Sequence, residues 1–267
     1  MTGEPAPAQT GCGLPLACGS MSRMTTAGPG AGIDRLNALV TPDLWREVDG
    51  MNRAAVVGWG TMFHVVHLVR AIRTLHSAGQ CHATVPLLRS VMEYALGTMW
   101  LADAGEDAVD VLNRRLQGSK RKLRADLELD SISLADFPAE AVRTFKDTLA
   151  AQLPPHPDER LSAFRHLLQE YGFEKMIPVY DVISGHTHRS LDGAQEFFQD
   201  ADATLSLSQQ PRHNELMPCE DICLGMQFDT MLAYNELLRT RPWTAQLPAI
   251  AGDHGLPVRL VARRPAS

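Results

Sequence analysis

The sequence is poor in several features that mark particular classes of protein. Its five cysteines are odd in number and scattered over 267 residues, which is not the framework of a secreted fold held by disulfides. The formal net charge is -6, so no long-range positive field draws the whole molecule to phosphate backbones or anionic lipid. We therefore expect a reducing compartment, and any contact with nucleic acid has to be local.

Signals for export or membrane insertion are lacking as well. Glu4 stands where a signal peptide would carry Lys or Arg, and no uninterrupted apolar stretch follows it. No segment reaches the roughly 18 consecutive apolar residues that a spanning helix needs. We expect a cytoplasmic protein without a membrane partner.

Large apolar side chains are scarce at the start of the chain. Gly, Pro, Ala, Thr and Ser dominate residues 1–33, and such a mixture does not offset the entropy lost on ordering. The glycines of residues 28–32 lack the preceding strand and following helix of a dinucleotide-binding loop. The sequence therefore predicts a disordered tail over residues 1–33.

The rest of the chain is rich in apolar residues at helical spacing. A strong amphipathic helix is predicted from Ala54 to Ala78, and a second from Pro86 to Ala102 is apolar nearly all round. We expect the second helix at the centre of the fold. Further helices are predicted over residues 106–129, 138–153, 158–171, 178–188 and 219–239. Six or seven helices with no convincing strand favour an all-α antiparallel helical bundle.

The predicted bundle forms a single domain over residues 34–241. Within it, residues 189–218 are polar and rich in turn formers, and the stretch is longer than most connections in compact domains. We expect a long loop or a lid there. Residues 242–267 are predicted to be a C-terminal tail, with only a weak strand-like stretch over residues 258–261.

Two charges interrupt the most apolar predicted helix, Arg89 and Glu93. Burying either charge alone would cost several kcal/mol, so they should pair with each other or with polar groups across the bundle. The base precedes the acid, which is the less favourable order for an isolated helix and therefore hints at a tertiary role. Two interpretations of Arg89 and Glu93 remain open: a structural buried pair, or the floor of a functional pocket.

A second polar group lies on the predicted helix that starts near Pro178. Tyr180, Ser184 and His188 share one face at intervals of four residues, and the sequence around Ser184 is not that of a nucleophile elbow. A hydrogen-bonded polar seam is therefore favoured over acyl transfer, with His188 able to titrate near neutral pH. Because buried polar groups need partners, we expect this group to meet the Arg89 and Glu93 pair. The candidate catalytic residues are Arg89, Glu93, Tyr180, Ser184 and His188.

Residues of metal-ligating type are present without a metal-binding pattern. His64 and His67 are three apart, but Glu-x-x-His pairs and the His-Glu-x-x-His motif are absent from the sequence. Cys219 and Cys223 share a helical face and lack two obvious partners. We expect no metal and no other cofactor.

The best candidate for contact with phosphates is a basic run in the predicted helix over residues 106–129. Acidic residues follow the run directly, so a solvated helix face with salt bridges remains the alternative, and Arg114→Ala should then cost about 0.5 kcal/mol or less. RNA is the expected partner of this local patch, and a homodimer or a protein partner stays open. The candidate nucleic-acid-binding residues are Arg114, Arg115, Lys120, Arg121, Lys122 and Arg124.

Two short stretches carry a resemblance to a known family. They are Leu87-Leu88-Arg89-Ser90-Val91-Met92-Glu93 and Tyr180-Asp181-Val182-Ile183-Ser184-Gly185-His186-Thr187-His188. Together with the charged helix between them, they resemble an uncharacterised bacterial family known only as a domain of unknown function, over roughly residues 54–238. That family is similar in turn to the HEPN helical bundles, many of which act as RNA-cutting toxins or phage-defence proteins.

The resemblance implies a HEPN-like bundle and possible ribonuclease chemistry through an arginine followed four to six residues later by a histidine. Arg160 with His166 fits this spacing, and so does Arg70 with His76, although His76 falls in the apolar arc of its predicted helix. The leading hypothesis is a HEPN-like RNA-acting toxin or defence protein. The alternative is a non-enzymatic interaction or regulatory module whose five candidate residues form a structural polar core. An Arg and a His converging in one cleft would favour the enzyme.

Overall fold

The computed structural model describes residues 28–129, 157–187, 197–201, 204–208, 211 and 219–258. The α-helices are α1 (Pro29–Leu39), α2 (Arg53–Ser77), α3 (Val85–Ala104), α4 (Glu106–Leu129), α6 (Phe164–Glu170), α7 (Ile177–Thr187), α9 (Cys219–Asn235) and α10 (Gln246–His254). Four 3-10 turns are η1 (Leu44–Glu47), η2 (Cys81–Thr84), η4 (Pro157–Ser162) and η5 (Glu174–Met176), and two short strands are β1 (Phe198–Ala201) and β2 (Thr204–Leu207). The all-α class is confirmed.

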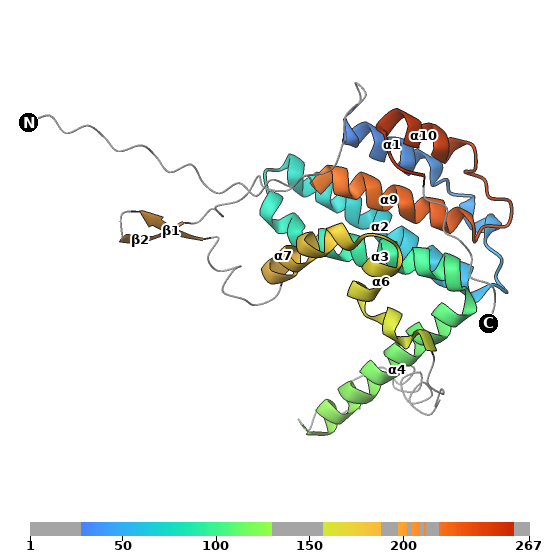
Figure 1. Cartoon of the computed structure of the whole chain (residues 1–267), viewed down its shortest axis with the longest axis horizontal. Coiled ribbons are helices and arrows are strands. Elements are labelled where there is room, and N and C mark those ends of the chain that lie inside the picture. The colour runs from blue at the N-terminus through green and yellow to red at the C-terminus, as the bar shows by residue number, and fades with distance from the viewer. Residues whose placement is uncertain are drawn as a thin grey trace, which may run out of the picture.

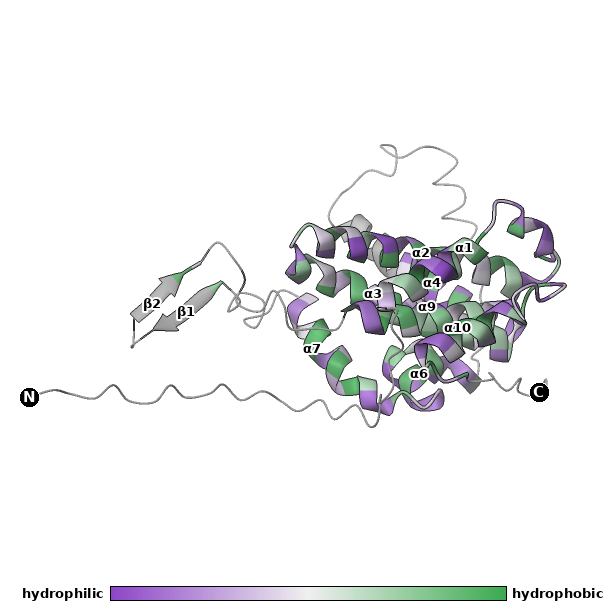
Figure 2. Cartoon of the chain, turned by 90° about the horizontal axis from the view of Figure 1, so that it is seen from above, coloured by the Kyte–Doolittle hydropathy of each residue, from purple (hydrophilic) through white to green (hydrophobic). Residues whose placement is uncertain are grey.

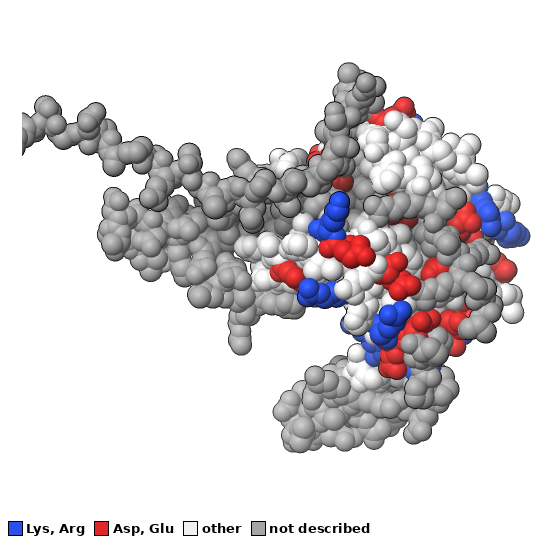
Figure 3. All heavy atoms as spheres, in the orientation of Figure 1, with Lys and Arg blue, Asp and Glu red and all other residues white. Residues whose placement is uncertain are grey.

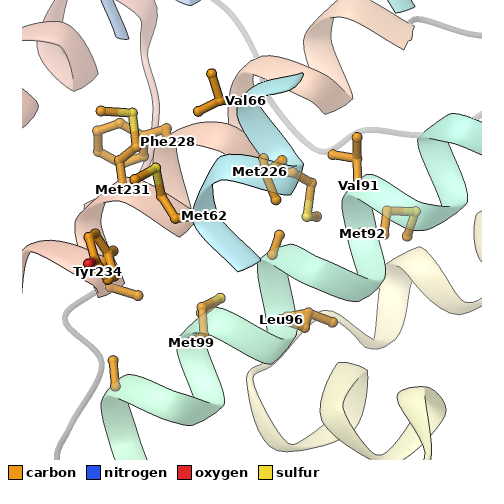
Figure 4. Packing of buried hydrophobic residues seen from close by; sticks show 14 of the residues in the cluster. Met62, Val66, Val91, Met92, Leu96, Met99, Met226, Phe228, Met231 and Tyr234 are labelled. Carbon is orange, nitrogen blue, oxygen red and sulfur yellow. The ribbon is translucent and has the colours of Figure 1, made fainter. Parts of the chain in front are cut away.

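Helix α3 lies at the centre of the bundle, as its apolar sequence predicts. It packs against α2 and α9 along its length and against α4, α6 and α7 on its other sides (Figure 1). The interior is filled by side chains from α2, α3 and α9 (Figure 4): Met62, Val66, Val91, Met92, Leu96, Met99, Met226, Phe228, Met231 and Tyr234. Each large side chain removed from water contributes roughly 1.5–3 kcal/mol, so these three helices hold the fold together.

Helix α2 begins and ends with the local signals that its sequence offers. The Asn52 side chain accepts a hydrogen bond from the Ala55 amide at 3.1 Å, which caps the first turn. Gly79 takes a positive φ of 72° after the last turn, a conformation that glycine adopts without strain. By length and composition alone, α2 is the one described helix that could cross a membrane, and here its buried face packs on α3 and α9.

The predicted tail over residues 1–33 is wrong for its last five residues. Residues 29–33 form the first turns of α1, Pro29 occupies the start of the helix, and Ile33 is fully buried. A Cβ atom at Gly32 would come within 2.8 Å of Leu224 in α9, so the missing side chain allows the two helices to approach. The absence of a side chain at Gly32 therefore serves the packing of α1 on α9.

The C-terminal region also corrects the sequence analysis, because α10 lies within the predicted tail over residues 242–267. Its Leu247 and Ile250 are buried, and the helix packs against α1 (Figure 1). The Trp243 indole donates to the Leu39 carbonyl at 3.2 Å, which fixes the turn before α10. The described chain therefore holds eight α-helices rather than six or seven.

Three further expectations concern the middle of the chain. The helix expected over residues 158–171 is divided into η4 and α6. Part of the expected loop over residues 189–218 is an antiparallel hairpin of β1 and β2, in which Phe198 pairs with Leu207. The helix expected over residues 138–153 lies outside the described residues. The strand-like stretch over residues 258–261 does too, apart from Val258, which lies outside any strand.

Candidate functional site

The two predicted polar groups meet where α7 packs on α3. Arg89 Nε donates to Glu93 Oε1 at 3.1 Å, and the Tyr180 hydroxyl donates to the same oxygen at 3.0 Å. The Arg89 guanidinium carbon also lies 5.3 Å from the centre of the Tyr180 ring, within the range of a cation–π contact. The expected bond between the groups is confirmed, and these three residues are called the α3–α7 network below.

The α3–α7 network is less deeply buried than its sequence context suggests. The Arg89 side chain is 19% exposed and that of Glu93 is 40% exposed, because positions 89 and 93 lie at the margin of α3 beside α7. Burial lowers the pKa of the Arg89 guanidinium. The hydrogen bond and charge of Glu93, helped by Tyr180, outweigh that effect and raise the pKa. The pair is therefore a charged, half-buried contact rather than the floor of a deep pocket.

The other members of the predicted seam are not all joined to this network. The Ser184 Oγ atom is buried and has no hydrogen-bond partner among the described residues. His188 lies outside the part of the chain that the structure describes. The neighbouring His186 instead meets His82 edge to face, with ring centres 6.1 Å apart.

The α3–α7 network connects directly to α6. The Tyr180 ring packs against Phe164, the first residue of α6, with ring centres 4.3 Å apart. At the other end of α6, the Tyr171 hydroxyl donates to the buried Asp103 carboxylate of α3 at 3.1 Å. Sequence analysis missed Phe164 and Tyr171, because the helix predicted over residues 158–171 does not reveal that α6 begins at Phe164. Both ends of α6 are thus held against the bundle.

One of the two Arg and His pairs with HEPN-like spacing spans the junction between η4, which carries Arg160, and α6, which carries His166. His166 Nδ1 lies 2.8 Å from the Arg160 carbonyl oxygen, because the chain turns from η4 into α6 between them. Both side chains are exposed, and Arg160 Nη2 lies 3.4 Å from Glu170 Oε2. The turn thus brings the imidazole and the arginine backbone into contact at the surface.

The second pair, Arg70 and His76, has a different setting. Both lie in the continuous helix α2, where residues six apart point in different directions. His76 is exposed, so the expectation that it falls in the apolar arc of its helix is wrong. The last buried residue of α2 is Ile72, one turn earlier. The His76 Nδ1 atom contacts Cys81 Sγ at 3.4 Å. The same sequence spacing therefore brings His166 to the Arg160 backbone, whereas it leaves the Arg70 and His76 side chains pointing in different directions.

The predicted basic run on α4 is partly used within the protein. Arg115 Nη1 donates to the Ser162 carbonyl and ties η4 to α4. Arg114 is half-buried, and its Nε and Nη2 atoms are shielded from solvent, so it is less exposed than the sequence suggested. Lys120 is half-buried, and the side chains of residues 121–129 are not among those described. On the face seen in Figure 3, basic side chains stand beside acidic ones.

The described residues that could bind a metal do not gather. Within the described ranges, no three or more His, Cys, Asp and Glu side chains form a group that could hold an ion. Cys219 and Cys223 are buried in α9, and burial raises the pKa of both thiols. A raised pKa disfavours the thiolate that would bind a metal.

The comparisons with known proteins give one result. The model of a family of unknown function, DUF5677, matches residues 57–204, which is more than half of the chain and includes most of α2 and all of α3 and α7. No curated protein and no solved structure matches the chain.

Proposed function

The chain belongs to the family of unknown function DUF5677, and we propose that it is a HEPN-like cytoplasmic ribonuclease of the bacterial toxin or phage-defence type. The observation that carries the proposal is the contact between His166 Nδ1 and the Arg160 carbonyl at 2.8 Å, with both side chains exposed. The turn holds an exposed imidazole against the backbone of an arginine whose side chain is also exposed, and these two kinds of group suit action on a phosphodiester.

The backbone contact determines which nitrogen of His166 does chemistry. When Nδ1 carries the hydrogen and donates it to the Arg160 carbonyl, Nε2 bears the free lone pair. Nε2 then accepts the proton of a ribose 2′-hydroxyl while the 2′-oxygen attacks the adjacent phosphorus. The bond to the 5′-oxygen breaks, and that oxygen takes up a proton. The products are a 2′,3′-cyclic phosphate and a 5′-hydroxyl, so DNA is not a substrate.

Arg160 supplies the positive charge that this reaction needs. Its guanidinium matches the oxygens of a phosphate in shape and charge, where negative charge grows as the 2′-oxygen attacks. In the free protein Arg160 lies 3.4 Å from Glu170 at an exposed position. Exposed ion pairs contribute only about 0–1 kcal/mol, so a phosphate can displace Glu170.

The α3–α7 network has a positioning role under this proposal. Tyr180 joins Glu93 to Phe164, and Phe164 lies two residues before His166 in α6. Arg89, Glu93 and Tyr180 thus act on the reaction through the placement of α6 rather than by contact with RNA. Ser184 and His188 belong to the same predicted seam and share this proposed role. The basic run of α4 supplies local contacts with phosphates, with Arg115 instead fixing η4.

The test uses the two pairs as matched halves of one experiment. We expect His166→Ala and Arg160→Ala to lower the cleavage of a labelled dinucleotide substrate by about 10²–10⁴-fold, the usual contribution of one catalytic group. The controls are His76→Ala and Arg70→Ala, which have the same spacing and should leave the cleavage of a dinucleotide substrate unchanged. Detection of the cyclic phosphate end checks the chemistry. Equal losses in both pairs, or none, would contradict the proposal.

A non-enzymatic interaction or regulatory module is the second candidate, and one observation favours it. The hydrogen-bonding groups of Arg89, Glu93 and Tyr180 engage one another, as in a structural polar core. Under this alternative, purified wild-type protein does not cleave RNA, and Glu93→Ala affects only stability. The same cleavage assay therefore separates the two candidates.

A further inference from the structure

The outward side of α2 carries a row of aromatic rings. Trp59, Phe63 and His67 follow at intervals of four residues, with neighbouring ring centres 4.5 and 6.2 Å apart. Beside them, His64 stacks on Tyr94 of α3 with ring centres 4.5 Å apart and planes within 10° of parallel. His64, His67 and Tyr94 are exposed, and Trp59 and Phe63 are half-buried. These five residues are called the α2 aromatic face.

The charge of α2 is as unusual as its rings. The helix has 25 residues, RAAVVGWGTMFHVVHLVRAIRTLHS, without a single Asp or Glu. Arg53 and Arg73 at its two ends are held in ion pairs with carboxylates of other elements. Arg70 is exposed, lies three residues beyond His67, and has no ion pair with any described side chain. In a chain of net charge -6, this helix presents rings and cationic groups without intervening carboxylates.

Aromatic rings beside a cation, on a helix without carboxylates, are a feature of surfaces that bind single-stranded nucleic acid. Protein interfaces are also enriched in aromatic residues and Arg, so the oligomeric state of the RNA-free protein is one outcome of the test below. Flat rings a few ångströms apart provide surfaces for bases, and the absence of carboxylates with Arg70 nearby is complementary to phosphate. Proteins that bind single strands combine these two features, since every base has a face that can stack on an aromatic ring.

We propose that the α2 aromatic face binds single-stranded RNA, with bases stacked on Trp59, Phe63 and Tyr94 and a phosphate held by Arg70. The choice of RNA over DNA rests on the proposed function, whereas the stacking surface does not. Helix α3 lies between α2 and α6, which bears His166 (Figure 2). The α2 aromatic face is therefore a second contact surface, reached by a strand that extends beyond the cleavage site.

The binding test uses the full chain with His166→Ala, so that the RNA is not cut. The probe is a fluorescein-labelled oligouridine of about 12 nucleotides, within the range of single-strand site sizes. We expect Tyr94→Ser and Phe63→Ala each to weaken binding by about tenfold, measured by fluorescence anisotropy. Arg70→Ala should lower the affinity and reduce the dependence on salt by about one phosphate contact. Tyr94 is exposed, so that variant remains informative if Phe63→Ala impairs folding.

The matched control is Trp45→Ala. Trp45 is an exposed tryptophan with the Arg46 guanidinium carbon 5.6 Å from its ring centre, and it lies in η1 rather than on α2 or α3. Its removal should leave the affinity unchanged. Binding should also quench the fluorescence of Trp59, and the Trp59→Phe variant should lack that change.

Several results would overturn the inference. The first is no binding of oligouridine, and the second is equal affinity for oligouridine in all the variants. The third is a change in the oligomeric state of the RNA-free variants without a change in their RNA affinity, which would show that the face is a protein interface. Preference for oligothymidine over oligouridine would overturn the assignment to RNA, and equal binding would support a surface that reads bases by stacking alone.

The inference and the proposed function fail separately. A dinucleotide substrate occupies only the cleavage site, so α2 variants should cut it normally while their KM for the longer RNA rises. An unchanged KM for the longer RNA would overturn the inference and leave the ribonuclease standing. Binding that depends on the α2 aromatic face, without cleavage by the wild type, would leave the inference standing and remove the ribonuclease.

Discussion

The core of the bundle and the edge that carries α6 are held in different ways. Helices α2, α3 and α9 have 25, 20 and 17 residues and share a continuous apolar interior. Helices α6 and α7 have 7 and 11 residues, and contacts such as Tyr171 with Asp103 and Tyr180 with Glu93 fix them on α3. Stability therefore depends mainly on the core, whereas the geometry of the candidate site depends on a few polar and aromatic contacts at the edge.

The largest effect on stability should come from the core. Leu96 is fully buried in α3, so Leu96→Ala removes apolar contacts and leaves a cavity. We expect a loss of about 2–5 kcal/mol in the free energy of unfolding, measured by urea denaturation. Leu116→Ala is the matched control, because this leucine of α4 is largely exposed and should cost about 0.5 kcal/mol or less. Similar costs for the two leucines would remove the distinction between core and surface.

The long helices were predictable because many residues contribute to their periodic signal. The bounds of α4 agree with the prediction at both ends, and those of α2 and α3 differ by one or two residues. The short helices α1 and α10 were missed because few residues contribute to their periodic signal. In the sequence Pro29 and Gly32 are typical of a disordered segment, and only the position of Leu224 shows why a glycine is needed at residue 32. Such information comes from a neighbour far away in the chain, which periodicity does not contain.

The next effect concerns the anchor at the end of α6. Tyr171→Phe removes the hydrogen bond to the buried Asp103 carboxylate, and we expect a loss of about 1–3 kcal/mol. Tyr94→Phe is the control on an exposed tyrosine and should change little. If both variants unfold at the same urea concentration, the hydroxyl of Tyr171 does not anchor α6.

The same tyrosine gives the stability a defined dependence on pH. Burial, together with the charge of Asp103, raises the pKa of Tyr171. Its phenol in the unfolded chain titrates near 10, so the unfolded state loses the proton first. The contribution is fully present below a pH of about 10 and is lost above it, at up to about 1.4 kcal/mol per pH unit. Unfolding measured from pH 8 to 11 should show a shallower decline for Tyr171→Phe than for wild type, and parallel declines would exclude this linkage.

The candidate site was predictable in its contacts and not in its burial. A charge within an apolar helix needs a polar partner, and the sequence offers one other polar stripe, so the bond between Tyr180 and Glu93 could be foreseen. The 40% exposure of Glu93 could not, because it depends on where α7 crosses α3. The contact between His166 and the Arg160 carbonyl was equally hidden, since it depends on a turn between η4 and α6 that spacing alone does not specify.

The smallest of the expected effects tests the α3–α7 network itself. A fully buried pair would make Glu93→Ala cost roughly 3–5 kcal/mol, as the sequence suggested, whereas exposed pairs contribute about 0–1 kcal/mol. Because the Arg89 side chain is 19% exposed and that of Glu93 is 40% exposed, we expect an intermediate loss of about 1–2 kcal/mol by urea denaturation. The control is Asp43→Ala, whose partner Arg46 lies 3.4 Å away at a largely exposed position, and it should cost about 0.5 kcal/mol or less.

A double-mutant cycle with Tyr180→Phe should give a coupling energy above about 0.5 kcal/mol, since the side chains of Glu93 and Tyr180 share one hydrogen bond. If Glu93→Ala costs no more than Asp43→Ala and shows no coupling to Tyr180, the network does not hold α7 on α3, and the positioning role of these residues toward α6 fails with it.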